Sequence, residues 1–159
     1  HVDVNFAAAM NDTDIQSYTS PSISQLTGVI GAGFKGKQLP QTAKYSYNLG
    51  AQYSANAAFL DDGEWFVRGD LSWKDKQFVD AANLTWIKAR TVVNFRAGLS
   101  KGPLSFDAYV NNAFNDKNYV SVAQNSLLTP SFALTAFNGY LNVGLPELRT
   151  YGARVSYKF

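Results

Sequence analysis

Side chains that could carry out catalysis are scarce in this chain. The single histidine is His1, and the chain contains no cysteine. Without several histidines or cysteines, the usual ligand sets of a zinc site cannot be assembled. The sequence also shows no nucleophile next to a general base, which covalent catalysis would require. We therefore expect no catalytic residue, no metal site and no cofactor, and we do not expect an enzyme.

One glycine-rich stretch has the spacing of a dinucleotide-binding loop. Residues 29–36 read V-I-G-A-G-F-K-G, which matches G-x-G-x-x-G after two β-branched residues. Such a loop holds a pyrophosphate only where a helix begins directly after it. Pro40 would break that helix within its first turns. We therefore interpret the stretch as a flexible glycine loop.

Two pairs of opposite charge stand out among the polar residues: Arg68 with Asp70, and Arg96 with Asp107. These pairs could line the path of a solute, but structural charges that hold neighbouring strands in register are the simpler interpretation. The net charge of +2 is too small to suggest a surface for nucleic acid. We therefore expect no nucleic acid among the partners.

The elements that must position these charges are segments in which apolar and polar residues alternate, as in β-strands with one apolar face. The last segment is a clear example, because Tyr151, Val155 and Tyr157 alternate with small and charged residues. The sequence predicts strands at residues 2–10, 45–57, 65–74, 93–99, 104–111 and 151–159. No position on the apolar side of these strands carries a charge, as expected of a wall that faces lipid.

The connections between the predicted strands alternate between long and short. Long loops are expected at residues 19–43, 75–89 and 115–147, and short turns at residues 61–63 and 100–103. Pairing Leu99 with Leu104 across the second turn would place Arg96 directly opposite Asp107. Outer-membrane barrels have short periplasmic turns and long extracellular loops, which is the same alternation.

These patterns predict an all-β fold: a segment of about six strands from an antiparallel up-and-down transmembrane β-barrel. The apolar side chains would touch lipid, and the polar ones would face a water-filled interior. No apolar run approaches the roughly 20 residues of a membrane helix. Two alternatives stay open here. One is a passive porin or oligomeric β-barrel subunit, and the other is a soluble β-barrel that binds a small apolar ligand.

Four segments resemble motifs of one family, the TonB-dependent outer-membrane receptors. They are G-K-Q-L-P-Q-T-A-K at 36–44 with the strand behind it, F-V-R-G-D-L-S-W at 66–73, V-N-N-A-F-N-D-K-N-Y at 110–119, and E-L-R-T-Y-G at 147–152 with Y-K-F at 157–159. The chain departs from the family pattern at Ala43, Ala113 and Leu148, and it carries an additional Asn115. Residues 1–159 are therefore similar to the C-terminal portion of the family's roughly 22-stranded barrel.

The resemblance implies active transport across the bacterial cell outer membrane. Members of the family take up scarce solutes, such as a ferric siderophore or a similar iron complex. A plug domain and a TonB box belong to regions outside this chain. The implied partners are outer-membrane lipid, TonB, the transported solute and the barrel-assembly machinery. That machinery would recognise Tyr157 and Phe159 in the C-terminal strand.

Solute contacts in this family come largely from extracellular loops. The ligand-binding candidates in the loops of this chain are the aromatic residues Trp86, Phe132, Phe137 and Tyr140. Their rings suit a planar chelator. Packing within the loops, or anchoring at the membrane interface, is the alternative interpretation.

Deleting Phe159 from the full-length receptor should impair membrane assembly more than solute binding. The terminal aromatic would be recognised by the barrel-assembly machinery, and it would lie at the end of the last strand opposite the long loops. The amount of receptor at the cell surface, measured by antibody labelling, should fall, while the affinity of the assembled fraction stays unchanged. Normal surface levels of the deletion variant would contradict this assignment.

Overall fold

The computed structural model describes residues 1–19, 33–58, 63–127 and 138–159. Its elements in this part of the chain are all strands: β1 (Val2–Met10), β2 (Tyr45–Ala57), β3 (Gly63–Lys74), β4 (Gln77–Phe78), β5 (Trp86–Ile87), β6 (Arg90–Lys101), β7 (Leu104–Asn111), β8 (Ser121–Leu127), β9 (Asn138–Gly144) and β10 (Thr150–Tyr157). Within the described residues no helix could span a membrane. The predicted all-β fold is confirmed.

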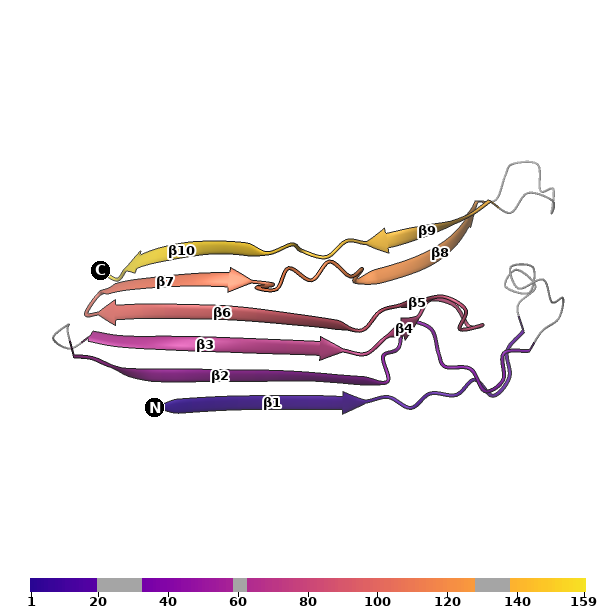
Figure 1. The fold of residues 1–159 in the computed structure, drawn as a ribbon, viewed down its shortest axis with the longest axis horizontal. Coiled ribbons are helices and arrows are strands. Elements are labelled where there is room, and N and C mark those ends of the chain that lie inside the picture. The colour runs from indigo at the N-terminus through magenta and orange to yellow at the C-terminus, as the bar shows by residue number, and fades with distance from the viewer. Residues whose placement is uncertain (20–32, 59–62, 128–137) are drawn as a thin grey trace.

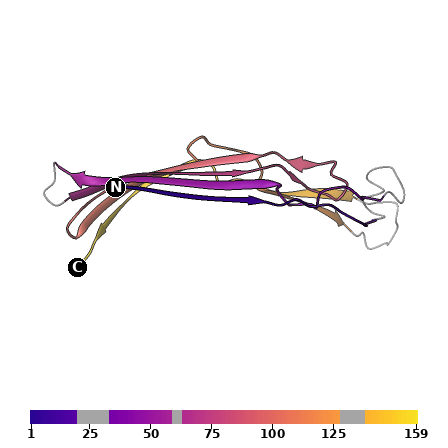
Figure 2. The same cartoon turned by 90° about the horizontal axis from the view of Figure 1, so that it is seen from below.

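Six of the strands form one open antiparallel sheet in the order β1-β2-β3-β6-β7-β10. Figure 1 shows these strands side by side, with β1 and β10 at the two edges. Seen edge-on in Figure 2, the sheet is a single thin layer. The arrangement is that of a segment of barrel wall, and the sheet is not closed on itself.

The apolar side of the sheet is uncovered. Tyr53 and Val67 are each 44% exposed, and Phe95 and Phe106 are each 47% exposed. A soluble barrel with an apolar interior would bury these four side chains against one another. Their exposure on one face of a single layer excludes that alternative for the described strands and fits a wall that meets lipid.

Aromatic pairs lie towards both ends of this apolar face. Tyr47 and Trp73 are cross-strand partners whose rings stack with centroids 5.0 Å apart. At the other end, the rings of Tyr53 and Trp65 lie 5.4 Å apart. Two belts of aromatic rings separated by aliphatic residues are typical of strands that cross both membrane–water interfaces.

Apart from Ala57 at the end of β2, the buried apolar side chains of the described residues lie in the long connections rather than between two layers. The first cluster comprises Ile15, Phe34, Ala81 and Ala82. The second comprises Val79, Ile87 and Val122. Each cluster joins two connections that are distant in sequence. The described parts of the long connections lie at one end of the sheet, and the β6–β7 turn lies at the other end (Figure 1).

The predicted register between the fourth and fifth wall strands is wrong by two residues. Leu99 pairs with Phe106, and the residue opposite Leu104 is Lys101. The turn contains only Gly102 and Pro103, and Gly102 has a φ of 53°. Glycine is preferred at the first central position of a tight type II′ hairpin turn, because positive φ is costly for other residues. The tighter turn lengthens both strands and shifts the register.

Two predicted loops contain short hairpins. Strands β4 and β5 pair within residues 75–89, and β8 pairs with β9 within residues 115–147. Strand β3 begins at Gly63, the last residue of a predicted turn whose other residues, Asp61 and Asp62, lie outside the described part. Strand β10 ends at Tyr157, two residues before the predicted end. The β4–β5 and β8–β9 hairpins are short and lack long alternating patterns, which is why alternation alone did not reveal them.

Replacing Gly98 by alanine should destabilise the wall. A Cβ atom at Gly98 would overlap the ring of Phe66, which lies across this glycine on the polar face. We expect a loss of about 1–3 kcal/mol, the usual cost of overpacking. The measurement is the urea midpoint of the full-length receptor in lipid vesicles, followed by tryptophan fluorescence.

Gly69 supplies the matched control on the neighbouring strand. A Cβ at this glycine would meet Phe95 at 3.4 Å, which is an ordinary contact, so Gly69→Ala should leave the midpoint nearly unchanged. Equal midpoints for Gly98→Ala and Gly69→Ala would show that the Phe66 ring does not require the glycine.

Candidate functional site

The middle of the polar face carries the two predicted charge pairs. Arg68 Nε donates to Asp70 Oδ2 at 2.8 Å, and Arg68 Nη2 donates to Asp70 Oδ1 at 2.6 Å. The same Nη2 reaches Asn5 Oδ1 on β1 at 3.3 Å. A two-pronged guanidinium–carboxylate contact is the strongest geometry available to such a pair. The contact with Asp70 fixes the direction of the Arg68 side chain along β3. The bond to Asn5 links Arg68 to β1, two strands away.

The second pair forms although the predicted register is wrong. Asp107 lies opposite Gly98 on β6 and opposite Arg154 on β10. Arg96 reaches it diagonally, with Nη2 at 3.2 Å from Asp107 Oδ2. The Arg96 guanidinium also lies over the Phe66 ring, 5.9 Å from its centroid. Carboxylate and ring together fix the direction of the Arg96 side chain along the polar face.

Arg68 and Arg96 face each other directly across β3 and β6. Like charges directly opposite each other are destabilising in a sheet. Each guanidinium has its own carboxylate, Asp70 or Asp107, so the two positive charges are separately neutralised. The polar face is therefore a balanced ion-pair array rather than a basic surface. Whether the array also guides a solute stays a prediction.

Glycines on the polar face make room for large neighbours. A Cβ at Gly50 would lie 2.8 Å from both Arg68 Nη2 and Asp70 Oδ1. A Cβ at Gly152 would lie 2.6 Å from the hydroxyl oxygen of Tyr109 on the paired strand. Because the glycines lack side chains, the ion pair and the tyrosine can lie across the strand beside them. This arrangement keeps the polar side chains close to the wall.

Of the four loop aromatics, Trp86 is the one whose side chain lies within the described part of the structure. Trp86 lies on β5 and is 55% exposed, whereas its neighbour Ile87 is buried. Phe132 and Phe137 lie outside the described residues. Tyr140 belongs to β9, but its side chain also falls outside the described part. Trp86 is the one candidate whose ring is seen to be available to a solute.

Side-chain amides hold the long connections together around β4 and β5. Asn83 accepts from the backbone N–H of Gln38 at 2.8 Å and donates to the Gln38 carbonyl at 2.9 Å. The buried Gln77 donates to the carbonyl of Gln41 at 2.7 Å. Asn83 thus imitates a paired strand residue, and it adopts the positive φ of 57° that asparagine tolerates. The β1–β2 and β3–β6 connections consequently form one folded layer.

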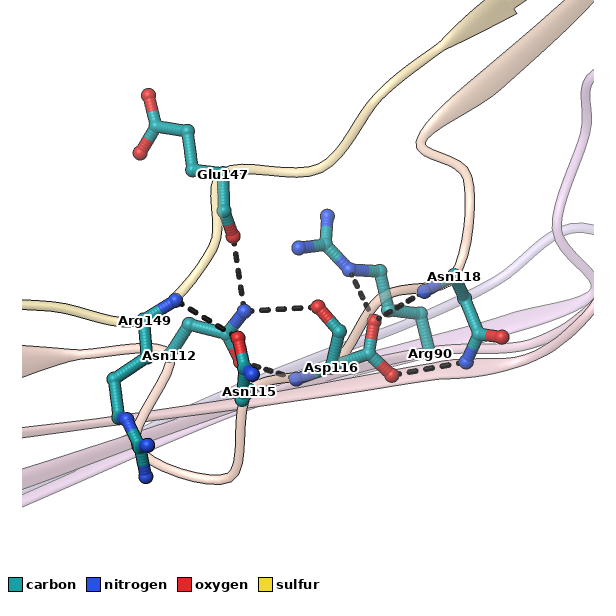
Figure 3. A network of polar contacts seen from close by, with 7 residues as sticks. All are labelled: Arg90, Asn112, Asn115, Asp116, Asn118, Glu147 and Arg149. Carbon is teal, nitrogen blue, oxygen red and sulfur yellow. Dashed lines mark hydrogen bonds and ion pairs between the residues drawn. The ribbon is translucent and has the colours of Figure 1, made fainter.

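A polar network at the junction between β7 and β10 was not anticipated from the sequence (Figure 3). Its centre is Asn112, which is only 3% exposed. Asn112 Nδ2 donates to the carbonyls of Asp116 and Glu147, both at 2.9 Å, and Oδ1 accepts from the Asp116 N–H at 2.8 Å. Two segments used above for the family resemblance, 110–119 and 147–152, are therefore joined physically. The burial of Asn112 is known only from the structure, so no signal in the sequence indicated this contact.

Asp116 extends this network to the first residue of β6. Its Oδ1 accepts from Arg90 Nε at 2.9 Å, and its Oδ2 accepts from Asn118 Nδ2 at 2.9 Å. Asn115, with a φ of 55°, accepts the N–H of Arg149 at 3.1 Å. These are structural contacts between strands. No three acidic, histidine or cysteine side chains gather as a metal site would need in the part of the chain that the structure describes.

The predicted assembly signal lies at the end of the sheet away from the long connections (Figure 1). The rings of Tyr157 and Phe159 meet edge to face with centroids 5.2 Å apart, and both are exposed. The Lys158 N–H donates to the Pro103 carbonyl in the β6–β7 turn at 2.9 Å. The terminal residues thus follow the edge of the sheet down to that turn. Their recognition by another protein stays a prediction.

Comparisons with known proteins agree with this geometry. A family model described as "TonB dependent receptor-like, beta-barrel" matches residues 3–113. Among solved structures, the chain is similar to BauA, the ferric preacinetobactin receptor from Acinetobacter baumannii, with 26% identity and a TM-score of 0.61 over 79% of this chain. The chain spans 16% of the length of that receptor. None of the curated protein sequences matches the chain.

Asp70→Asn should destabilise the wall by removing the charge partner of Arg68, which then faces Arg96 uncompensated. We expect a modest decrease in the urea midpoint, because the contact is charge-assisted but exposed to solvent. The measurement is the urea midpoint of the full-length receptor in vesicles. Asp70→Asn should lower the midpoint less in the Arg96→Gln background than in the native background, because the opposing charge is then absent.

Glu64→Gln is the control, because this carboxylate lies on the polar face of the same strand and forms no ion pair within the described residues. It should leave the midpoint nearly unchanged. Equal effects of Asp70→Asn with and without Arg96→Gln would show that the two arginines do not interact.

Proposed function

The chain belongs to the TonB-dependent receptor family, and from this membership we propose that it is part of the barrel of an outer-membrane receptor for active solute uptake. The single observation that carries the proposal is the uncovered apolar face of a single-layer antiparallel wall, where the one charged residue within the described strands is Lys101, beside the β6–β7 turn. Such a face is stable in lipid and unfavourable in water. The bacterial outer membrane is where the family's barrels work.

Strand length supports a membrane location. Strands β2, β3 and β6 contain 13, 12 and 12 residues. A strand tilted as in a barrel crosses the hydrocarbon core with about 9–11 residues. The Tyr47–Trp73 and Tyr53–Trp65 pairs lie where the two interfaces would be. These three strands are thus long enough to cross a bilayer, and the aromatic pairs on β2 and β3 lie towards their two ends.

The polar face supports a role in transport rather than in catalysis. Most of its residues are small polar residues, glycines and charged side chains, and Arg68 and Arg96 in its middle are each paired with a carboxylate. Such a face suits the wall of a water-filled or plugged interior. Regions of the receptor outside this chain would supply the plug and the contact with TonB. The barrel-assembly machinery would engage β10 and Phe159, and lipid would cover the apolar face.

An iron complex is the solute class that we propose. The structural relative described above is a receptor for ferric preacinetobactin, which supports a ferric siderophore or a similar complex as the solute here. Trp86 is the loop aromatic that could contact a planar chelator, since more than half of its surface is exposed. Phe132, Phe137 and Tyr140 remain proposed contacts in the other long connection.

Uptake of ⁵⁵Fe complexes by cells that make the full-length receptor tests the proposal. Catecholate, hydroxamate and mixed-ligand ferric chelators should be compared in iron-starved cells with and without TonB. We expect at least one complex to enter only when both receptor and TonB are present. The amount of receptor at the surface, measured by antibody labelling, serves as the control for expression.

Uptake that persists without TonB, or after collapse of the proton-motive force, would instead identify a passive porin. Absence of receptor-dependent uptake for every chelator would remove the iron assignment while leaving the barrel wall intact. Trp86→Ala should weaken the uptake of the accepted complex at low concentration and leave surface levels unchanged.

A further inference from the structure

Strands β7 and β10 continue outward into the hairpin of β8 and β9, but the two ladders are not continuous. The β7–β10 ladder ends at the pair Asn111 and Thr150. The β8–β9 ladder begins at the pair Ser121 and Gly144. Between these pairs, the chain runs through residues 112–120 on one side and the shorter stretch 145–149 on the other. Figure 1 shows the β8–β9 hairpin extending beyond the wall from this interrupted root.

An interrupted ladder is a natural pivot, because in the described residues the root keeps an isolated backbone bond to the wall, from the Ala113 N–H to the Val93 carbonyl at 2.8 Å, in place of a regular ladder. The Asn112 network occupies this position (Figure 3). From one buried side chain, Asn112 bonds to the incoming stretch at Asp116 and to the outgoing stretch at Glu147. Its own N–H donates to Asn94 Oδ1 on β6 at 2.9 Å. Asn112 therefore connects both stretches of the root to the wall.

Two further contacts make the root a closed structure. Asn115 Oδ1 accepts the Arg149 N–H, which ties the two stretches together a second time. Asp116 accepts from Arg90 at the start of β6, and the side chains of this pair are only 14% and 23% exposed. Each stretch is thus held both to the other stretch and, directly or through Asn112, to the wall.

We propose that Asn112, Asn115 and Asp116 form a latch that fixes the direction of the β8–β9 hairpin relative to the barrel wall. Asn112 is the positioning residue at its centre. The side-chain amide of Asn112 offers two N–H donors and one acceptor oxygen. It therefore bonds to backbone groups of both stretches, as the missing ladder would have done. Its φ of 49° turns the chain out of the β7 direction at the same residue.

The consequence for solute binding rests on the proposed function. The β8–β9 hairpin belongs to the long connection between β7 and β10, and its described part carries the exposed Leu141 and Val143. A latched hairpin would hold such exposed side chains in one orientation and reduce the ordering cost of binding. Val122, near the start of β8, is buried with Val79 and Ile87 and gives the hairpin a second attachment. The two attachments must be tested separately.

The test measures the direction of the hairpin in the full-length receptor in lipid nanodiscs. Spin labels on Thr91→Cys at the wall and Leu141→Cys on β9 report their separation by pulsed electron paramagnetic resonance. Both positions are exposed, and this chain contributes no native cysteine. The receptor with an intact latch should give one narrow distance distribution.

Asn112→Asp removes the two Nδ2 donors and places a charge against two carbonyls. Asn112→Gly removes the side chain but still permits the positive φ. Both variants should lose the narrow distribution, in the native background and with Val122→Ala. The amides of Asp116 and Arg149 should exchange hydrogen at least about tenfold faster, as expected for the loss of one to two buried hydrogen bonds.

Asn111→Asp is the matched control, because it introduces the same charge one residue earlier on an exposed side chain whose bond to Thr150 Oγ1 is long, at 3.5 Å. It should keep the narrow distribution. The proposal is overturned if the distance distribution of Asn112→Gly is as narrow as that of Asn111→Asp in either background, native or Val122→Ala. The side chain of Asn112 would then not be a latch.

The affinity for the ⁵⁵Fe complex that enters through the receptor separates this inference from the proposed function. A released hairpin together with weakened binding supports both the latch and its part in solute recognition. A released hairpin with unchanged binding leaves the latch standing and overturns the assignment of this hairpin to the solute site.

Discussion

Backbone pairing between neighbouring strands is the constraint on which the whole wall depends. In hydrocarbon no water is available, so each N–H and C=O of a spanning strand must find its partner on the next strand. Pairing in turn fixes the register, and register decides which side chains share a face. The alternation of apolar and polar residues can therefore become two chemically distinct surfaces only because the ladders of β1, β2, β3, β6, β7 and β10 are in step.

The polar surface illustrates how closely this register is used. It places Arg68 against Arg96, an unfavourable neighbour, yet it also brings Asp70 and Asp107 within reach of the two guanidinium groups. Gly50 leaves room for the first pair, and Gly98 leaves room for Phe66, on which Arg96 lies. A shift by one residue would move every one of these groups to the lipid side. Charge balance and glycine placement are thus consequences of one register.

Beyond the wall, the strands no longer pair in long ladders, and side-chain amides take over the same task. Asn83 pairs with the backbone of Gln38, and Asn112 pairs with the backbone of Asp116 and Glu147. Asparagine suits both places because its amide resembles a peptide group and its backbone tolerates positive φ. The long connections are consequently a folded layer whose small apolar clusters, around Phe34 and Val122, lie outside the lipid-facing wall. In a receptor, such a layer can present side chains to a solute in a defined geometry.

The amino-acid sequence by itself determined the six wall strands, their two faces and the resemblance to the family. Period-two alternation is a local property, so β1, β2 and the body of β3, β6, β7 and β10 could be located from neighbouring residues alone. The motif segments at 36–50, 66–73, 110–119 and 147–152 identified the family for the same reason. Only the tertiary structure decided the β6–β7 register, since a turn of two residues rather than four changes every partner beyond it. It also decided the contacts of Asn112 and Asn83, because a hydrogen bond between residues 35 or 45 positions apart leaves no local pattern in the sequence.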